Sequence, residues 1–168
     1  MLPSISVIPG MVLPLGTPCK SQWVSGGIDR ISQRIALAEP KVAAAIDGIK
    51  ARSPHATVLL VNYLAGLPEV GCWLYVPILN EDMPWLREKL VELNRMLARV
   101  ARAKGARLVD TFSGSQGHDA CKLPGTNWIE GLLPVSTTPL GLMVPFHPNQ
   151  LGANYQAGTV LRALGVGG

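Results

Sequence analysis

The segment 143–152 contains the residue best suited to acid–base chemistry, His147. Pro148 restricts the residue before it to extended backbone angles and suits the first positions of a helix, so His147 is expected at a helix N-terminus. The positive end of the helix dipole disfavours a charged imidazolium there, and a general base requires the neutral ring. The sequence therefore predicts that His147 is a catalytic base.

A nucleophile for this base is hard to find. Ser4 and Ser6 are the hydroxyl groups nearest the start of the chain, and neither follows a strand or sits in a glycine-containing turn. Ser25 precedes Gly26 and Gly27 and is better placed to cap the helix that follows. The sequence therefore predicts no nucleophile.

Length and composition favour one globular domain over residues 1–168, because 48% of the residues are hydrophobic and 15% are charged. The net charge of +4 is spread over helices that also carry Glu, so nucleic acid is not an expected partner. No apolar run reaches the roughly 18 residues of a membrane span, and residues 2–15 lack the basic start of a signal peptide. Stable membrane insertion is therefore not expected, and no export signal is recognised.

The three cysteines are Cys19, Cys72 and Cys121, and none belongs to a CxxC pair. A structural zinc site is therefore not expected, and no other metal or cofactor has support in the sequence. In a secreted protein the simplest arrangement is a Cys72–Cys121 disulfide that leaves Cys19 over. A reducing compartment would keep all three as thiols.

Helical and extended patterns alternate along the chain. Residues 28–53 have apolar side chains at helical spacing, and Pro40 either kinks this helix or opens a second one. The apolar run 57–63 is typical of a parallel strand covered on both faces. A strongly amphipathic helix is expected over 84–104 and a second strand over 107–112. This order predicts a parallel crossover unit and an α/β fold.

The rest of the chain supplies few further strands. Residues 1–25 read as irregular, and a long loop over 121–146 precedes a final helix over 148–164. Two parallel strands cannot form a stable sheet, because both faces and both edges need partners. Either short strands in residues 1–25 escape recognition, or the chain lacks the N-terminal part of a larger domain, and we expect the second.

Five short segments occur in an order that resembles a known family. They are residues 17–20, 25–27, 117–121, 128–131 and 147–149, with the sequences TPCK, SGG, GHDAC, WIEG and HPN. In this order they resemble the actinobacterial secreted lipases and esterases of the SGNH (GDSL) hydrolase superfamily. The resemblance runs from about Leu15 to Leu164, and the GHDAC and HPN segments carry most of its specificity.

The resemblance implies a three-layer α/β/α sandwich with a parallel sheet, here without its N-terminal strands, and hydrolysis of carboxylic esters by a serine. The family's Gly-Asp-Ser nucleophile segment and Gly-Asn-Asp oxyanion-hole segment are both missing from this sequence. His147 matches the family's catalytic histidine. The aspartate often found three residues earlier is Val144 here, so the resemblance implies that the Val144 carbonyl orients the Nδ1 proton of the ring.

Structural roles also follow from the resemblance. It implies the Cys72–Cys121 disulfide, with the usual partner of Cys19 absent, and an extracellular location. His118 is expected to belong to the loop that positions Cys121, and Asp110 to support a neighbouring loop rather than to serve as a catalytic acid.

The leading hypothesis is a monomeric, N-terminally truncated segment of a secreted ester hydrolase that acts on a small-molecule ester or lipid. Because the nucleophile is missing, the chain alone is expected to be inactive. The alternative is a catalytically dead relic that binds a lipid or glycan in the former substrate cleft, and a product that does not fold alone is a third reading. A truncation, a wrongly assigned start codon or a degraded gene would each account for the missing segments.

Overall fold

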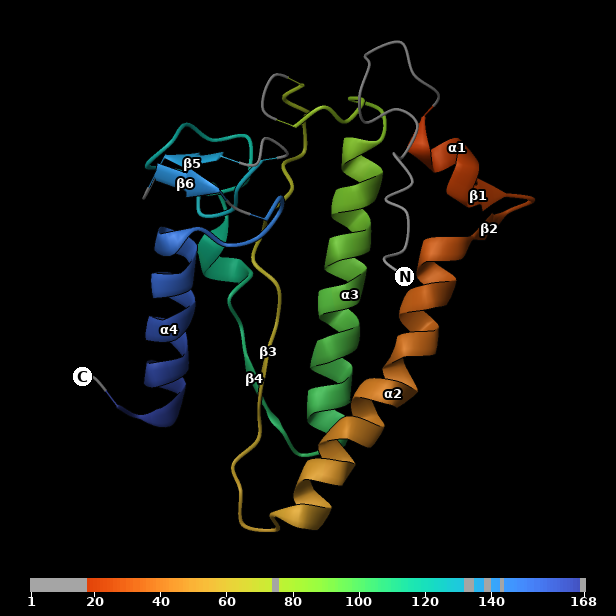
Figure 1. Cartoon of the computed structure of the whole chain (residues 1–168). Coiled ribbons are helices and arrows are strands. Elements are labelled where there is room, and N and C mark those ends of the chain that lie inside the picture. The colour runs from red at the N-terminus through yellow and green to blue at the C-terminus, as the bar shows by residue number, and fades with distance from the viewer. Residues whose placement is uncertain (1–17, 74–75, 132–134, 138–139, 143, 167–168) are drawn as a thin grey trace.

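A computed structural model describes residues 18–73, 76–131, 135–137, 140–142 and 144–166 of the chain (Figure 1). The helices are α1 (Cys19–Trp23), α2 (Arg30–Arg52), α3 (Met83–Ala103) and α4 (Gln150–Leu164), with a 3-10 turn over Ser113–Ser115. The strands form three separate pairs, which are β1 (Val24–Ser25) with β2 (Ile28–Asp29), β3 (Leu59–Val61) with β4 (Arg107–Val109), and β5 (Val135–Thr137) with β6 (Leu140–Leu142).

The predicted strand–helix–strand unit is present as β3, α3 and β4. The two strands are parallel, with Leu59 opposite Arg107 and Val61 opposite Val109. Figure 1 shows this pair between α4 on one side and α3 with α2 on the other, so that helices lie on both sides of a small parallel sheet. The α/β fold class is confirmed.

The long helices α2 and α3 pack against each other through an apolar core. The buried residues of this core are Ile46, Met96, Leu97 and Val100. Leu97 and Val100 come from the apolar face predicted for the amphipathic helix over 84–104, and Met96 comes from the same helix. Pro40 lies inside α2, which is assigned as one helix from Arg30 to Arg52, so the alternative of a second helix is excluded.

A second core lies under the loops that follow β3 and β4. Its buried residues are Leu64, Val76, Ile78, Met83, Ala120 and Ile129. Most of these residues come from stretches without regular structure. The loops beside the predicted catalytic residue therefore pack on an apolar core.

The irregular segment predicted over 1–25 is only partly described, since residues 1–17 lie outside the described residues. Residues 19–25 form α1 and β1, and β1 pairs with β2 rather than with the parallel sheet. The helix α1 escaped prediction because its N-terminus is capped from far away. The Asp82 carboxylate accepts hydrogen bonds from the backbone N–H groups of Cys19 and Lys20 at 2.6 and 2.9 Å.

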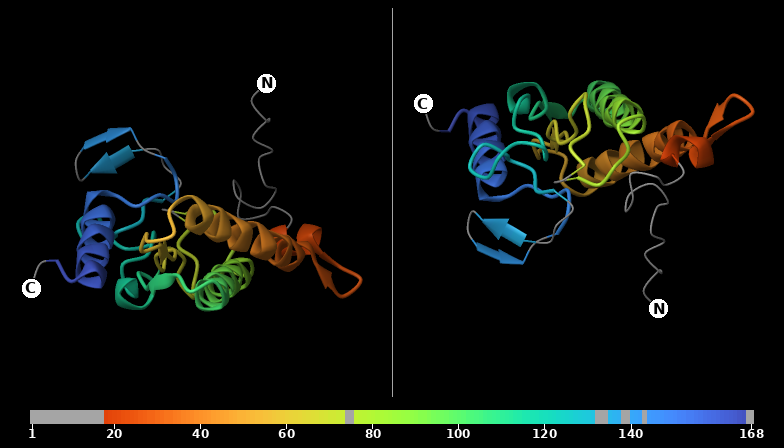
Figure 2. Two further views of the ribbon diagram at one scale, coloured as in Figure 1. Left: turned by 90° about the horizontal axis from the view of Figure 1, so that it is seen from below. Right: turned by 90° about the horizontal axis from the view of Figure 1, so that it is seen from above.

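Two hairpins were not predicted from the sequence. The β1–β2 hairpin projects from the side of the molecule opposite α4 in both views of Figure 2. The β5–β6 hairpin lies within the segment 121–146, which the sequence analysis treats as a loop. Both consist of strands of two or three residues, which are too short to give a clear alternating pattern.

Candidate active site

His147 lies in the loop that leads into α4. The sequence predicts a helix that begins at Pro148, but α4 begins two residues later, with Asn149 as its N-cap. The Asn149 side chain accepts hydrogen bonds from the backbone N–H groups of Leu151 and Gly152 at 3.0 and 3.1 Å. His147 is therefore further from the helix dipole than predicted, and the effect of that dipole fades within one turn.

A backbone carbonyl orients the His147 ring, although it is not the predicted one. The ring Nδ1 lies 3.0 Å from the carbonyl oxygen of Pro145. The Val144 carbonyl instead accepts a hydrogen bond from the backbone N–H of His147 at 3.2 Å, which closes a tight turn. The assignment of Val144 is therefore corrected to Pro145, because the turn at Phe146 brings the ring to the Pro145 oxygen.

This contact determines which ring nitrogen carries the proton. A carbonyl oxygen can only accept a hydrogen bond, so the Nδ1 of a neutral His147 ring must be the protonated nitrogen. The lone pair is then on Nε2, where a general base needs it. The His147 side chain is exposed, so Nε2 is accessible to a reacting group.

Phe146 is the residue that shapes the turn between Pro145 and His147. It is the one non-glycine with a positive φ, 59°, among the described residues. A bulky side chain rarely adopts this left-handed conformation, which persists only where the surrounding structure holds it. The conformation of Phe146 therefore requires support from neighbouring segments.

The segment 128–130 supplies that support through backbone hydrogen bonds. The N–H of Glu130 donates to the His147 carbonyl at 3.0 Å, and the N–H of Phe146 donates to the Glu130 carbonyl at 3.3 Å. The Asn149 N–H donates to the Trp128 carbonyl at 3.0 Å. The WIEG and HPN segments, two of the five segments of the family resemblance, therefore form one backbone-paired unit.

Gly152 allows this unit to form. A Cβ atom at this position would lie 2.3 Å from the carbonyl oxygen of Trp128, which is closer than real Cβ contacts allow. The first turn of α4 can approach the 128–130 segment only without a side chain here. The sequence analysis did not single out Gly152, although a glycine in the first turn of a helix is a usable signal.

His118 has the structural role that the sequence predicts. Its ring stacks on the indole of Trp128, with centroids 3.7 Å apart and planes 3° from parallel, and its Nδ1 lies 2.7 Å from the Thr126 carbonyl oxygen. Tyr155 of α4 contacts the same indole at 4.5 Å between ring centroids. This aromatic stack joins α4 to the GHDAC loop.

The cysteines are arranged as the secreted alternative predicts. Cys72 and Cys121 form a disulfide, which ties the loop after β3 to the GHDAC loop. Cys19 is a buried thiol in α1. Burial, together with the nearby carboxylate of Asp82, raises the pKa of the Cys19 thiol to about 11. The thiolate required for nucleophilic chemistry is therefore disfavoured at this position.

Asp110 supports a loop, as the sequence predicts. Its carboxylate accepts hydrogen bonds from the Asn62 side chain and from the backbone N–H of Phe112, each at 3.0 Å. Burial opposes ionisation of Asp110, but hydrogen bonds from Ser113, Asn62 and the loop N–H groups lower its pKa below the ordinary value. The Asp110 carboxylate thus accepts hydrogen bonds from the loop after β4 and from Asn62 rather than from the His147 ring.

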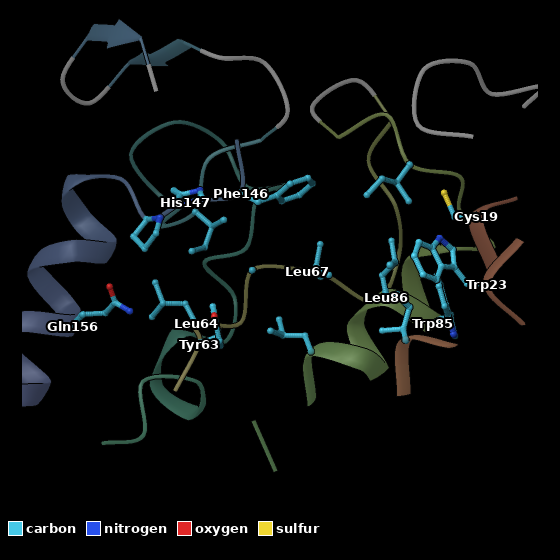
Figure 3. Close-up of a pocket in the computed structure, with 16 residues that line it drawn as sticks. Cys19, Trp23, Tyr63, Leu64, Leu67, Trp85, Leu86, Phe146, His147 and Gln156 are labelled. Atoms are coloured by element: carbon cyan, nitrogen blue, oxygen red, sulfur yellow. The ribbon is translucent and has the colours of Figure 1, made fainter. Parts of the chain in front are cut away.

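An apolar cavity of about 490 Å³ adjoins His147 (Figure 3). His147, Phe146 and Gln156 border it at one end, and Trp85, Trp23 and Cys19 border it at the other, as Figure 3 shows. Of the apolar residues that follow β3, Leu67 lies between these ends and Leu64 lies at the His147 end. A cavity of this size and character is typical of small-molecule sites.

The structure places no predicted nucleophile in this cavity. Ser4 and Ser6 lie outside the described residues, and Ser25 belongs to β1 in the projecting hairpin. The cavity lining, as far as the described residues define it, contains no serine. Within the same residues no group of His, Cys, Asp and Glu is arranged to hold a metal ion, and no helix is long and apolar enough to cross a membrane.

Comparisons with known proteins agree with this architecture. Residues 22–155 match the model of the GDSL-like lipase/acylhydrolase family. Lipase 2 of Streptomyces coelicolor is 37% identical over 154 residues, which are 90% of this chain and 50% of that protein. The crystal structure of a phospholipase A1 from Streptomyces albidoflavus matches with a TM-score of 0.61 at 20% identity, over 81% of this chain and 55% of the other.

The chain thus spans about half the length of the curated relative that it matches. The phospholipase likeness concerns the fold, because the sequence identity is low. The family model, in contrast, covers most of the chain, including the GHDAC, WIEG and HPN segments. The chain therefore belongs to the GDSL-like lipase/acylhydrolase family, within the SGNH hydrolase superfamily that the sequence motifs indicate.

Proposed function

We propose that this chain carries the proton-transfer half of a carboxylic ester hydrolase, with His147 as general base and then general acid. The observation that carries this proposal is the contact between Nδ1 of His147 and the Pro145 carbonyl, at the edge of an apolar cavity. Family membership supports the same reaction class.

The proposed reaction uses Nε2 of His147. A serine hydroxyl gives its proton to Nε2 while its oxygen attacks the ester carbonyl, which forms a tetrahedral oxyanion. The imidazolium then returns the proton to the departing alcohol, and an acyl-enzyme remains. Water repeats the sequence, and its attack releases the carboxylic acid. The Pro145 carbonyl keeps the ring oriented during both proton transfers.

The cavity indicates the class of substrate. Its walls are formed mostly by aliphatic and aromatic side chains, which favour the acyl chain of a lipid or another apolar ester. Each buried methylene contributes about 0.8 kcal/mol to such binding. We therefore propose an ester with an apolar acyl group rather than a short, polar one.

The disulfide indicates the compartment. Bonds such as Cys72–Cys121 form and persist in oxidising environments, and they are rare in the cytosol. We propose that the protein acts outside the cell.

The nucleophile is the part of the reaction that the described residues do not supply. No serine lines the cavity within these residues, and the Gly-Asp-Ser segment of the family is absent from the sequence. We propose that the chain by itself does not turn over esters, because the loss of the serine removes most of the rate enhancement of such enzymes.

A chimera tests the proposed function. The part of Streptomyces coelicolor Lipase 2 that this chain does not match would be joined to this chain at the end where it lies in Lipase 2. The chimera should hydrolyse p-nitrophenyl esters and react with a fluorophosphonate probe, and the chain alone should do neither. His147→Ala in the chimera should lower kcat by about a thousandfold or more.

His55→Ala provides a matched control, because His55 is an exposed histidine before β3 that lies outside the site. This variant should retain full activity. Labelling of the chain alone that a single Ser→Ala change abolishes would contradict the proposal, as would a chimera that His147→Ala leaves active. Saturable lipid binding without turnover in the chimera would favour the relic alternative.

A further inference from the structure

The charged residues of α2 are divided between different sides of the helix. Its acidic residues, Glu39 and Asp47, pair with basic residues of α3 at 2.8 and 2.5 Å. Three basic residues in its first half, Arg30, Arg34 and Lys41, are exposed and form no ion pair with any described residue. They follow one another at helical spacing, so they lie on one face of α2.

Apolar side chains are exposed among these cations. Leu37 lies on the same face, between Arg34 and Lys41, and is 65% exposed. Ile28 precedes Arg30 by two residues, in the hairpin that projects from the molecule in Figure 2, and is 51% exposed. These five residues are called the basic surface below. Basic residues mixed with exposed apolar ones are typical of segments that lie on membranes.

The cations of the basic surface have no anion beside them to neutralise their charge. The nearest acidic residue in the sequence, Asp29, already pairs with Lys89 at 3.0 Å. Arg30 donates one hydrogen bond to the Gln22 carbonyl, and Arg34 makes none with a described residue. The remaining guanidinium N–H groups match the geometry of phosphate oxygens, which they bind through two parallel hydrogen bonds.

Trp23 connects the basic surface to the apolar cavity. The guanidinium carbons of Arg30 and Arg34 lie 5.6 and 4.7 Å from the centroid of its ring. The same side chain borders the cavity at the end away from His147 (Figure 3). Tryptophan is enriched where lipid meets water, because its ring is apolar and its N–H is polar. A membrane on the basic surface would therefore lie next to the cavity.

We propose that the basic surface docks the protein on a bilayer that contains anionic lipids. The lipid phosphates complement Arg30, Arg34 and Lys41, while Ile28 and Leu37 enter the boundary between headgroups and acyl chains. The docking is peripheral and requires no spanning helix. Its purpose, which is access to an apolar ester in the bilayer, rests on the proposed function, whereas the binding itself requires no turnover.

Vesicle flotation tests this docking. The full chain would be mixed with vesicles of phosphatidylcholine alone, or of phosphatidylcholine with an equal amount of phosphatidylglycerol. The chain should bind the anionic vesicles far more strongly, and added salt should weaken the binding because it screens the attraction. Arg30→Gln combined with Arg34→Gln and Lys41→Gln should weaken binding about a hundredfold, at roughly fivefold for each charge.

The matched control changes three other exposed arginines. Arg95→Gln combined with Arg102→Gln and Arg162→Gln lowers the net charge by the same amount, but these residues belong to α3 and α4. This variant should bind anionic vesicles nearly as well as the unaltered chain. Equal losses in the two triple variants would show that net charge, rather than the basic surface, attracts the lipid.

A second variant covers the case in which the changes beside Trp23 abolish the cooperative thermal melt. Leu37→Ser alters neither arginine and removes an exposed apolar side chain, so it should weaken binding at least fivefold, by a rough estimate from side-chain burial. Leu161→Ser is its control, because Leu161 is an exposed leucine of α4. Only the change at Leu37 should reduce binding.

Three further results would overturn the docking surface. They are no binding to anionic vesicles, equal binding to neutral vesicles, and binding of double-stranded DNA without binding of vesicles, which would assign the surface to another polyanion. The docking and the proposed function can fail separately. A chimera that binds vesicles without hydrolysing esters would refute the function, and one that hydrolyses soluble esters without binding vesicles would refute the docking.

Discussion

The loop that carries His147 and the strand β3 lead into the same cavity, but they are held in different ways. Backbone hydrogen bonds from the 128–130 segment, an aromatic stack and a nearby disulfide fix the loop. On the edge of β3 away from β4, no described residue pairs with the backbone groups of Leu59 and Val61, and the Tyr63 side chain is largely exposed. The contrast teaches that contacts among the described residues position the His147 loop, whereas no described segment pairs with the outer edge of β3.

Loss of the disulfide should weaken the fixed region most. Cys72→Ala with Cys121→Ala opens a loop with a sequence separation of 49, and the entropy gained by the unfolded chain predicts a loss of about 4 kcal/mol. Urea unfolding of the chain measures this change. A loss below about 1 kcal/mol would mean that the GHDAC loop does not depend on the bond, and the contrast between the two regions would weaken.

Gly152→Ala should destabilise the same region by about 2 kcal/mol, because the new methyl group meets the Trp128 carbonyl oxygen. Gly158→Ala in the same helix is the control. Its Cβ would meet only the end of the flexible Arg162 side chain, at 3.4 Å, so this change should stabilise the protein by up to about 1 kcal/mol. Equal effects of the two substitutions in urea unfolding would show that α4 does not press against the 128–130 segment.

Asp29 links the helices that form the far wall of the cavity, and it should give stability a dependence on pH. Its carboxylate accepts from Nε1 of Trp85 at 2.8 Å and pairs with Lys89 at 3.0 Å. Burial opposes its ionisation, but the hydrogen bonds from Trp85 and Lys89 lower its pKa to about 2 from 3.8. The unfolded state therefore binds more protons between pH 4 and pH 2, and stability is lost as the pH falls through that range.

Asp29→Asn tests this link. The variant should lose less stability than the unaltered chain between pH 4 and pH 2, by about 1 kcal/mol after allowance for solvent screening. Thermal melts across that range measure the difference. Identical pH profiles would mean that Asp29 is not held by Trp85 and Lys89 in solution.

The smallest change in stability is expected at Tyr63, which lies just after β3. Tyr63→Ala should change the stability of the isolated chain by only about 0.5 kcal/mol, because the side chain is 57% exposed. A loss of about 2 kcal/mol or more would show that Tyr63 is covered in solution. That result would remove the distinction between the two regions.

The sequence predicted the parts of the fold that follow from local patterns. The periodicity of residues 84–104 and the apolar run 57–63 identified α3 and β3, and their order implied the parallel pairing with β4. Distant features were not predictable in this way. The helix α1 depends on a cap from Asp82, which lies 63 residues after Cys19, and no local pattern reports such a contact.

The site was predicted in outline and missed in detail. The Cys72–Cys121 disulfide is confirmed by the structure, and the catalytic role of His147 stays a prediction. The orienting carbonyl was misplaced by one residue, since the path of the turn depends on the left-handed conformation of Phe146. A bulky residue gives no sequence signal for that conformation.

The tautomer of His147 tests the account most directly. Nitrogen-15 correlation spectra of the imidazole, recorded on the chain alone at a pH where the ring is neutral, distinguish a proton on Nδ1 from one on Nε2. The contact with the Pro145 carbonyl predicts a proton on Nδ1 and a bare Nε2. A ring protonated on Nε2, or one that exchanges between both forms, would contradict the claim that this chain positions its own base.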